Sequence, residues 1–463
     1  MGDQSKRNSF TGSIGFILSA AGSAVGLGNI WRFPYLAARN GGGLFLLIYI
    51  LLALTFGYTL LTTEIAIGRR TRQSPLTAYR RVDRRMGWIG IFACVVPAII
   101  LPYYCAIGGW VLKYFLVFLT GHGTEAAADG YFSAFISGQT EPIVMAGIFL
   151  AVTALVIYRG VERGIEASSK VLMPLLLLLV IIIAVFSLTM KSDSAGEVRT
   201  GLQGLKILVI PDLSSLTLSG LFGVITEAMG QLFYSLSVAM GIMIAYGSYV
   251  SDDTDLGQSI NCIEIFDTLI AFLAGVMIIP AVYVFSGIEG MSAGPSLMFI
   301  TLPKLFASMG RVGSVIGCLF FAMVLFAALT SSVSIMEAVV SSFMDRFGMS
   351  RRRAFATETV IAAVAAVIVC LGYNVLYFNV TLPNGASAQI LDIMDYVSNN
   401  ILMPVVSIGT CILIGWMAGA DTVISEVEKN GHVMGRKGLY RIMIRYVAPV
   451  LLSILLLKSL GIL

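Results

Sequence analysis

Long apolar stretches recur along nearly the whole chain, and they limit its fold more than any other feature. Each contains about 20 residues, which is the length that a helix needs to cross the hydrocarbon core of a bilayer. Of the 463 residues, 57% are hydrophobic and 12% are charged, whereas an ordinary soluble domain has roughly 25% charged residues. The sequence therefore predicts an all-α polytopic membrane protein with a single transmembrane domain over residues 1–463.

Eleven apolar segments can be counted in the sequence. Their approximate bounds are 12–38, 43–68, 88–119, 142–159, 167–190, 218–249, 256–285, 312–344, 354–373, 388–418 and 441–462. Arginine and lysine gather in connections that all fall on one side of the membrane, most densely between residues 69 and 85. Because basic connections stay in the cytoplasm, we expect a cytoplasmic N-terminus and a cell membrane (plasma or inner) location. With an odd number of segments, the C-terminus is expected outside the cytoplasm.

The sequence offers little chemistry for an enzyme or a zinc centre. The six cysteines lie in apolar segments without a CxxC pair, and His122 and His432 lie in predicted connections, so neither a disulfide framework nor a zinc site is expected. No HExxH motif occurs, which disfavours a zinc-dependent membrane enzyme. The basic residues behind the net charge of +4 are sorted by topology, so no nucleic-acid partner and no organic cofactor are expected.

Two of the apolar segments are interrupted near their middle. The first contains Gly22, Gly26, Gly28 and Asn29, all poor helix formers. The sixth is interrupted by serine and glycine at 231–241. Small residues of this kind also serve close packing between membrane helices, but two interrupted segments in corresponding halves of a chain indicate a transporter site at the membrane midplane.

The interrupted first and sixth segments each begin a set of five segments. Because five is odd, the second set has the opposite orientation in the membrane, which predicts a 5+5 inverted-repeat bundle with unwound first and sixth helices. The two repeats would cover about 12–190 and 218–418, and one extra helix would follow at about 441–462.

Residues 22–29, Gly-Ser-Ala-Val-Gly-Leu-Gly-Asn, and Trp-Arg-Phe-Pro at 31–34 closely resemble the first-helix signature of the neurotransmitter:sodium symporters. The resemblance includes 231–237 and 327–332 and extends to about residue 414, and eleven helices are similar to the family's bacterial amino-acid branch. It implies a sodium-coupled symporter that exposes one midplane site alternately to each side of the membrane. An amino-acid sensor or channel of the same fold stays an open alternative.

The resemblance also implies two sodium sites made of oxygen ligands. The ligands of the first would be Ala24, Asn29, Ser235 and Asp267, together with the substrate carboxylate. The ligands of the second would be Gly22, Val25, Ala327, Thr330 and Ser331. Without the resemblance, Thr330 and Ser331 would be interpreted as ordinary hydrogen-bonding residues between helices.

Asp267 departs from the family pattern. The family usually has asparagine here, and a bound chloride or a glutamate one turn later supplies negative charge; that later position is Ala271 in this chain. Tyr49, Gln231 and Ser235 match the other chloride ligands. We therefore expect Asp267 to supply the charge itself and transport to be chloride-independent, with proton countertransport as a corollary because an emptied site favours the protonated acid.

The substrate is expected to be a hydrophobic L-amino acid, aliphatic with aromatic ones as a further option. Gly26 leaves room for a carboxylate where monoamine-transporting members have aspartate, and the matched pocket contains no acid or base to favour a charged side chain. Ala239, where many relatives have glycine, narrows the pocket and favours medium aliphatic side chains over tryptophan. The residues expected to bind substrate are Ala24, Gly26, Leu27, Ile100, Tyr104, Phe233, Tyr234, Ser235, Ser237, Ala239, Met240, Ser331 and Ile335.

The resemblance implies gates on both sides of this pocket. Arg32 and Asp395 match an outer ion pair, with Tyr104 and Phe233 as a lid. The inner closure would use Arg7, Asp345, Ser248 and Tyr249, although Arg7 and Asp345 can also be read as solvated loop charges. Glu64 matches an acid that ties the second helix to the two broken ones, and Gly164 with Pro174 would let the fifth helix unwind inward.

Overall fold

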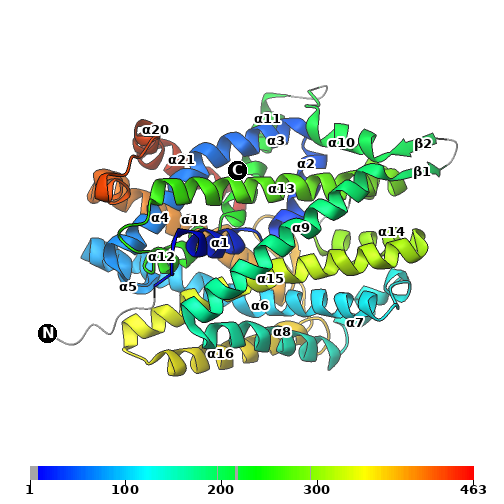
Figure 1. The fold of residues 1–463 in the computed structure, drawn as a ribbon, viewed down its shortest axis with the longest axis horizontal. Coiled ribbons are helices and arrows are strands. Elements are labelled where there is room, and N and C mark those ends of the chain that lie inside the picture. Colours follow the sequence, from blue (N-terminus) through cyan, green and yellow to red (C-terminus); the bar gives the residue numbers. More distant parts are fainter. Residues whose placement is uncertain (1–8, 195–196, 214–216, 292–293) are drawn as a thin grey trace.

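The computed structural model describes residues 9–194, 197–213, 217–291 and 294–463. Most of the long helices run along one common direction (Figure 1). Within the described residues, the β structure consists of two short antiparallel hairpins and one isolated bridge between Gly42 and Pro211. The prediction of an all-α polytopic membrane protein is confirmed.

The first five predicted segments and their connections form the following elements. They are α1 (Ser13–Ala24), η1 (Gly28–Arg32), α2 (Phe33–Arg39), α3 (Gly43–Leu52), η2 (Ala53–Gly57), α4 (Tyr58–Thr71), α5 (Pro75–Val82), η3 (Arg84–Met86), α6 (Gly87–Leu119), η4 (Glu125–Ala127), α7 (Tyr131–Ile136), α8 (Glu141–Tyr158), η5 (Val161–Glu166) and α9 (Ala167–Thr189).

The following elements run from the first hairpin to the eighth segment. They are β1 (Lys191–Ser194), β2 (Glu197–Thr200), α10 (Gly201–Val209), α11 (Leu218–Ser235), α12 (Ile242–Gly247), α13 (Leu256–Ser286), η6 (Ile288–Gly290), η7 (Leu297–Thr301), α14 (Leu302–Ser308) and α15 (Gly310–Phe347).

The last elements close the bundle. They are α16 (Arg351–Leu371), β3 (Val380–Thr381), β4 (Ser387–Ala388), α17 (Ile390–Asp395), η8 (Tyr396–Leu402), α18 (Met403–Ile412), η9 (Leu413–Met417), α19 (Asp421–Val427), η10 (Lys429–Gly431), α20 (Lys437–Ile442), η11 (Met443–Val447) and α21 (Ala448–Ser459).

By length and composition, nine helices in the described part of the chain are able to cross a membrane, or ten when the bent first segment is included. The remaining predicted segment is the sixth, where α11 and α12 are separated by a non-helical stretch and neither qualifies alone. The count of eleven and the repeat bounds therefore stay predictions. The outer faces of α9 and α16 expose large apolar side chains such as Val171, Val185 and Val364, as expected of helices that face lipid.

Both interruptions are true breaks in the helical backbone. The first segment bends by 54° between Ser13–Ala24 and Gly28–Arg39. In the sixth segment, Ser237 and Ala239 have φ of 53° and 64°, and Gly241 has φ of 69°. Side chains with a Cβ rarely adopt this left-handed region, so the chain between α11 and α12 cannot continue as a regular helix.

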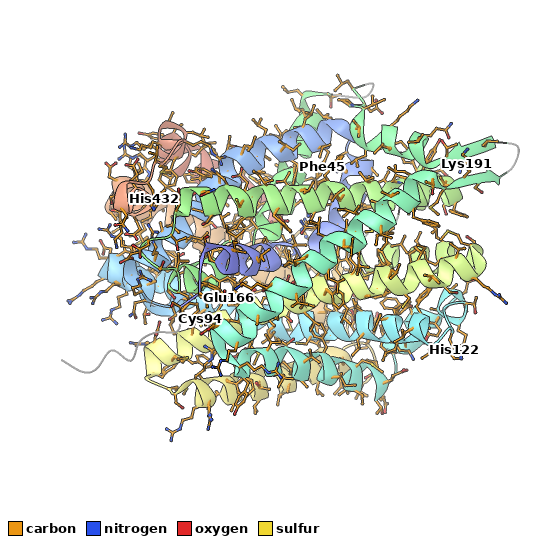
Figure 2. The ribbon with its side chains drawn as sticks, viewed as in Figure 1. Phe45, Cys94, His122, Glu166, Lys191 and His432 are labelled. Carbon is orange, nitrogen blue, oxygen red and sulfur yellow. The ribbon has the colours of Figure 1, made fainter. Side chains whose placement is uncertain are left out.

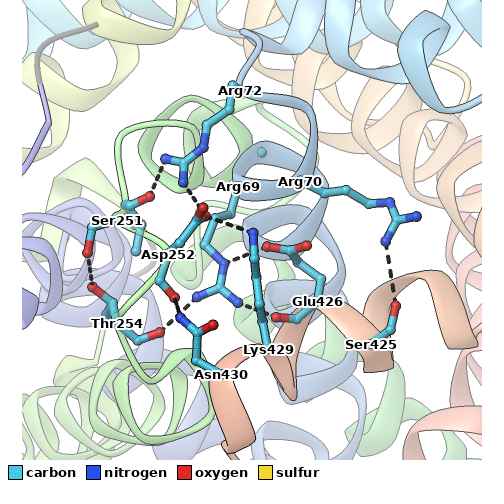
Figure 3. A network of polar contacts seen from close by, with 12 residues as sticks. Arg69, Arg70, Arg72, Ser251, Asp252, Thr254, Ser425, Glu426, Lys429 and Asn430 are labelled. Atoms are coloured by element: carbon cyan, nitrogen blue, oxygen red, sulfur yellow. Dashed lines mark hydrogen bonds and ion pairs between the residues drawn. The ribbon is translucent and has the colours of Figure 1, made fainter. Parts of the chain in front are cut away.

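A polar network ties three connections together at the end predicted to be cytoplasmic (Figure 3). The side chain of Arg69 is fully buried, and its Nε donates to Oε1 of Glu426 at 2.7 Å. Its Nη1 donates to the carbonyl of Thr254 at 2.8 Å. The network therefore fixes α4 against both the α12–α13 connection and α19.

Asp252, in the same network, accepts hydrogen bonds from Lys429 at 3.0 Å and from Arg72. Burial acts to raise the pKa of Asp252, but these two cations outweigh it and hold the pKa below its usual value. His122 and His432 lie at opposite ends of the bundle (Figure 2), in connections as the sequence indicates.

Candidate functional site

The break in the first segment faces α15, and backbone oxygens of the break gather around one hydroxyl group. The Oγ of Ser331 lies 3.2 Å from the carbonyl oxygen of Ser23 and 3.4 Å from those of Gly22 and Val25. A hydroxyl donates one hydrogen bond, so Ser331 satisfies at most one of these three carbonyl oxygens.

Thr330 belongs to the same group of oxygens. Its Oγ1 donates to the carbonyl of Ala327 at 3.0 Å, and its Cβ lies 3.3 Å from where a Cβ on Gly22 would stand. The five predicted ligands of the second sodium, which we call the neutral cluster (Gly22, Val25, Ala327, Thr330, Ser331), therefore converge from α1 and α15.

A second group of polar side chains surrounds Asp267 on α13, at the outer side of the first break. Oδ1 of Asp267 accepts hydrogen bonds from Asn29 Nδ2 at 2.8 Å and from Ser235 Oγ at 2.7 Å. Its Oδ2 accepts one from the Tyr49 hydroxyl at 3.2 Å. We call these four residues (Asn29, Tyr49, Ser235, Asp267) the carboxylate cluster; all four are buried.

No arginine or lysine in the described part of the chain forms an ion pair with Asp267. Tyr49 and Ser235, which match chloride ligands of the family, instead donate to its carboxylate. Gln231 donates to the carbonyl of Gly28 at 3.0 Å, and its buried Oε1 has no hydrogen-bond partner. The hydroxyls of Tyr49 and Ser235 are thus both engaged by the Asp267 carboxylate.

A cavity with an empty volume of about 360 Å³ lies between the two clusters. It is lined by Ser23, Ala24, Gly26, Leu27, Gly28, Asn29, Ile100, Tyr104, Tyr234, Ser235, Ser237, Met240, Ser331 and Ile335. The hydroxyl of Tyr104 is buried without a hydrogen-bond partner and lies 3.4 Å from where a Cβ on Gly26 would stand. The cavity therefore combines apolar walls with an unused donor beside Gly26.

Two predicted pocket residues, Phe233 and Ala239, do not line this cavity. Phe233 lines the outer cavity described below. Ala239 is fully buried, and its backbone N–H donates to Oε1 of Glu64 at 2.6 Å. Glu64 thus ties α4 to the break of the sixth segment, while its other oxygen has no hydrogen-bond partner.

Ser23 and Gly28 line the cavity although neither was named as a pocket residue. The Oγ of Ser237 donates to the carbonyl of Ser23 at 2.9 Å, and the two hydroxyls lie 3.2 Å apart. This contact joins the two breaks directly. The sequence gives a signal for this contact, because both interrupted stretches contain serine and a buried serine hydroxyl needs a hydrogen-bond partner.

Outside Tyr234 lies a larger cavity of about 730 Å³, whose lining includes Arg32, Phe233 and Asn399. Within the described ranges, no ion pair joins Arg32 to Asp395. Asp395 accepts a hydrogen bond from Asn399 Nδ2 at 2.6 Å instead. Both predicted gate residues flank the outer path, but the direct pair is not formed here.

The opposite side of the cavity is closed by direct contacts. The hydroxyl of Tyr249 donates to Glu337 at 2.7 Å, and Arg351 pairs with Glu337 at 2.6 Å. The ring of Phe10 packs edge-on against Tyr246 and Tyr249, at 5.7 and 6.3 Å between ring centroids. These contacts close the side predicted to be cytoplasmic, whereas the larger cavity lies on the other side of Tyr234.

The remaining residues predicted for the inner closure have separate partners. Asp345 accepts a hydrogen bond from the backbone N–H of Ser74 at 2.6 Å, and Ser248 donates to the carbonyl of Ala245 at 2.6 Å. Arg7 lies outside the described residues. The fifth segment is wound in this structure, because η5 contains Gly164 and continues directly into α9, which contains Pro174.

The sequence of this chain is similar to those of known transporters. The model of the sodium:neurotransmitter symporter family matches residues 7–126 and 137–462. The uncharacterized sodium-dependent transporter YhdH of Bacillus subtilis is 33% identical over 460 residues, with 97% of each chain covered. The sodium- and chloride-dependent taurine transporter of Bos taurus is 24% identical over 479 residues, which cover 92% of this chain and 74% of that protein.

A solved structure, that of MhsT in complex with L-phenylalanine, has the same fold. It matches with a TM-score of 0.84 and 34% sequence identity, and the match covers 98% of this chain and 100% of that chain. The family model and the long relatives agree over almost the entire length. The chain belongs to the sodium:neurotransmitter symporter family.

Proposed function

We propose that the protein is a symporter that couples sodium to the uptake of a hydrophobic L-amino acid and does not need chloride. The single observation that supports this most strongly is the carboxylate cluster, in which Asp267 stands beside Asn29 and Ser235 at the edge of the cavity. Oxygen-rich groups at helix breaks are the ligands by which such transporters bind sodium. Asp267 adds a fixed negative charge to them.

The walls of the cavity support a substrate with a hydrophobic side chain. Leu27, Ile100, Met240 and Ile335 are apolar, and no charged side chain lines the space. The free hydroxyl of Tyr104 and the open position at Gly26 offer a donor and room for a carboxylate. We infer that a zwitterionic amino acid places its carboxylate there and its apolar side chain against the walls.

The charge balance of the site supports chloride independence. Two sodium ions and a zwitterion bring net positive charge into a site from which water is largely excluded, and a negative charge nearby offsets it. The Asp267 carboxylate already accepts hydrogen bonds from Tyr49 and Ser235, so these groups are not free for an anion. Proton countertransport is the corollary, since a proton would neutralise Asp267 when sodium has left.

Counterflow in proteoliposomes tests the proposal. Vesicles loaded with unlabelled leucine should accumulate labelled leucine when sodium is present and not when choline replaces it, and gluconate in place of chloride should change nothing. Sodium-dependent binding without accumulation would favour a sensor. Loss of uptake without chloride would refute the role given to Asp267, and a pH-sensitive dye inside the vesicles reports proton countertransport.

A competition panel of leucine, isoleucine, valine, methionine, phenylalanine and tryptophan, with glutamate and lysine as charged controls, measures the substrate preference. The proposal requires every charged competitor to be weaker than the apolar ones. If glutamate or lysine competes best, the apolar walls do not select the substrate.

A further inference from the structure

The short helix α5 lies at the end of the bundle predicted to be cytoplasmic (Figure 1). Together with the turn η3 it carries four arginines. Arg80, Arg81, Arg84 and Arg85, which we call the α5 arginines, are all exposed. Among the residues that the structure describes, none of them pairs with an acidic side chain. Residues 80–85 carry four arginines and one acid, Asp83, whose Oδ1 accepts a hydrogen bond from the backbone N–H of Arg85 at 2.8 Å.

Other arginines at the same end form ion pairs, two of them buried or partly buried and one at the surface. Arg69 pairs with Glu426 at 2.7 Å, and Arg436 pairs with Glu264 at 2.8 Å. Arg441 pairs with Asp421 at 2.6 Å. The α5 arginines form no such ion pair within the described residues. Arg346, Arg352 and Arg353 are likewise exposed and form no ion pair there, but no tryptophan lies near them in the sequence.

An apolar surface begins directly beyond the α5 arginines. Trp88, Ile91 and Val95 on α6 are 39%, 54% and 37% exposed, and their spacing places them near one face of the helix. The ring of Trp88 packs edge-on against Phe92, with 5.9 Å between ring centroids. Exposed tryptophan beside exposed aliphatic side chains is typical of the boundary between headgroups and hydrocarbon.

The element that carries the arginines is firmly held. Pro75, Ala78 and Tyr79 are its buried residues, and the Tyr79 hydroxyl lies 2.9 Å from Oγ1 of Thr410. Where a Cβ on Gly241 would stand, the ring of Pro75 is only 2.5 Å away. The α5 arginines thus sit on a fixed support that touches the inner half of the broken sixth segment.

We propose that the α5 arginines, with Trp88 at the membrane boundary, bind the headgroup of an anionic phospholipid of the cytoplasmic leaflet. Guanidinium groups donate paired hydrogen bonds to phosphate oxygens, and Trp88 would lie along the glycerol and upper acyl chain. Each basic residue at an anionic membrane surface strengthens binding by about fivefold. The proposal is independent of the transported substrate and rests on the predicted orientation.

Native mass spectrometry of the detergent-purified full chain tests the proposal. The protein is titrated with phosphatidylglycerol, and with phosphatidylcholine and inorganic phosphate as comparison ligands. We expect phosphatidylglycerol to bind at least tenfold more tightly than phosphatidylcholine. Replacing Arg81, Arg84 and Arg85 by glutamine should weaken phosphatidylglycerol at least tenfold. The matched control replaces Arg346, Arg352 and Arg353 by glutamine and should change it less than twofold.

A second pair of variants leaves every charge in place, so that membrane insertion is not disturbed. Trp88→Ala should weaken phosphatidylglycerol binding about threefold, whereas Trp416→Ala, which removes another exposed tryptophan, should not. Raising choline chloride from low to high concentration should also weaken binding, because salt screens exposed charges. Choline is used because sodium is itself a ligand of the protein.

Several results would overturn the proposal. Equal binding of the two lipids, or equal loss in the two triple variants, would mean that the α5 arginines form no specific site. Competition by inorganic phosphate at the concentration of the lipid would point to a free phosphate site. Tighter binding of a polyglutamate peptide than of phosphatidylglycerol would point to an acidic protein partner in place of lipid.

Discussion

The carboxylate cluster and the neutral cluster both use oxygen atoms around the break of the first segment, but only one of them carries a formal charge. In the carboxylate cluster, three donors converge on the two oxygens of Asp267. The neutral cluster consists of backbone carbonyls and two hydroxyls and contains no acidic side chain. The negative potential of the carboxylate cluster comes mainly from one residue, whereas that of the neutral cluster comes from several uncharged dipoles.

This difference indicates which groups of the site can be removed with the smaller loss of sodium binding. A unit charge about 5 Å away contributes about 3 kcal/mol at an effective dielectric near 20. A single neutral hydrogen-bonding group contributes about 1 kcal/mol. Removal of the Asp267 charge should therefore weaken sodium binding more than removal of any one oxygen of the neutral cluster. Four experiments examine this expectation.

The largest effect is expected from Asp267→Asn. Removing the charge should raise the sodium concentration for half-maximal binding by roughly 100-fold, which corresponds to about 3 kcal/mol. Scintillation proximity binding of labelled leucine measures it. Glu264→Gln is the matched control, because Glu264 is a buried acid on the same helix but pairs with Arg436. If both variants behave alike, the charge of Asp267 has no special role.

The double variant Thr330→Ala and Ser331→Ala should raise the same sodium midpoint by about tenfold to thirtyfold, since two neutral groups of about 1 kcal/mol each are lost. Ser332→Ala serves as control, because its hydroxyl lies 2.8 Å from Thr153, away from the cavity. Unchanged sodium dependence in the double variant would remove Thr330 and Ser331 from the ion site.

In the double variant Asp267→Asn and Ala271→Ser, the fixed charge of Asp267 is lost, and a bound chloride ion should supply the negative charge in its place. With Tyr49, Gln231 and Ser235 retained, chloride should improve leucine binding of this variant about fivefold over gluconate, while the parent protein is indifferent. Asp267→Asn with Ala274→Ser, one turn further along α13, should not respond to chloride. A chloride response in both variants, or in the parent, contradicts the assignment.

The smallest effect is expected at Ala239, which belongs to neither cluster. Glycine adopts the left-handed backbone there without the hindrance that alanine meets, so Ala239→Gly should favour tryptophan over leucine by about threefold in a competition assay. Ala245→Gly, in the helical part of the same segment, should leave the ratio unchanged. Equal ratios in the two variants would show that the break does not set substrate size.

The helices could be predicted from sequence where a single physical rule decides. Apolar runs of about 20 residues form membrane helices because hydrocarbon leaves backbone groups no other partner, and the bounds of α6 and α13 each differ from expectation by one residue at one end. The sixth segment is different. Its serine and glycine predict the interruption within 231–241 that the structure has, but residue type alone does not predict the left-handed conformations of Ser237 and Ala239.

The two clusters could be placed only through the resemblance. Asn29 and Asp267 are 238 positions apart, and neither periodicity nor spacing brings them together. Contacts between a side chain and a backbone group were harder still, as with Glu64 and the N–H of Ala239. The Arg32–Asp395 pair could not be judged from sequence, because its formation depends on whether the outer path is open or closed.

The left-handed residues of the sixth segment also bear on the thermodynamics of binding. Because Ser237 and Ala239 already hold the backbone in a conformation that a helix cannot adopt, few main-chain torsions remain to be ordered when a ligand enters. Fixing the backbone of one residue removes about 1–2 kcal/mol of conformational entropy at 25 °C, and here that loss occurs when the protein folds. Calorimetry should therefore show an association whose unfavourable entropy is small.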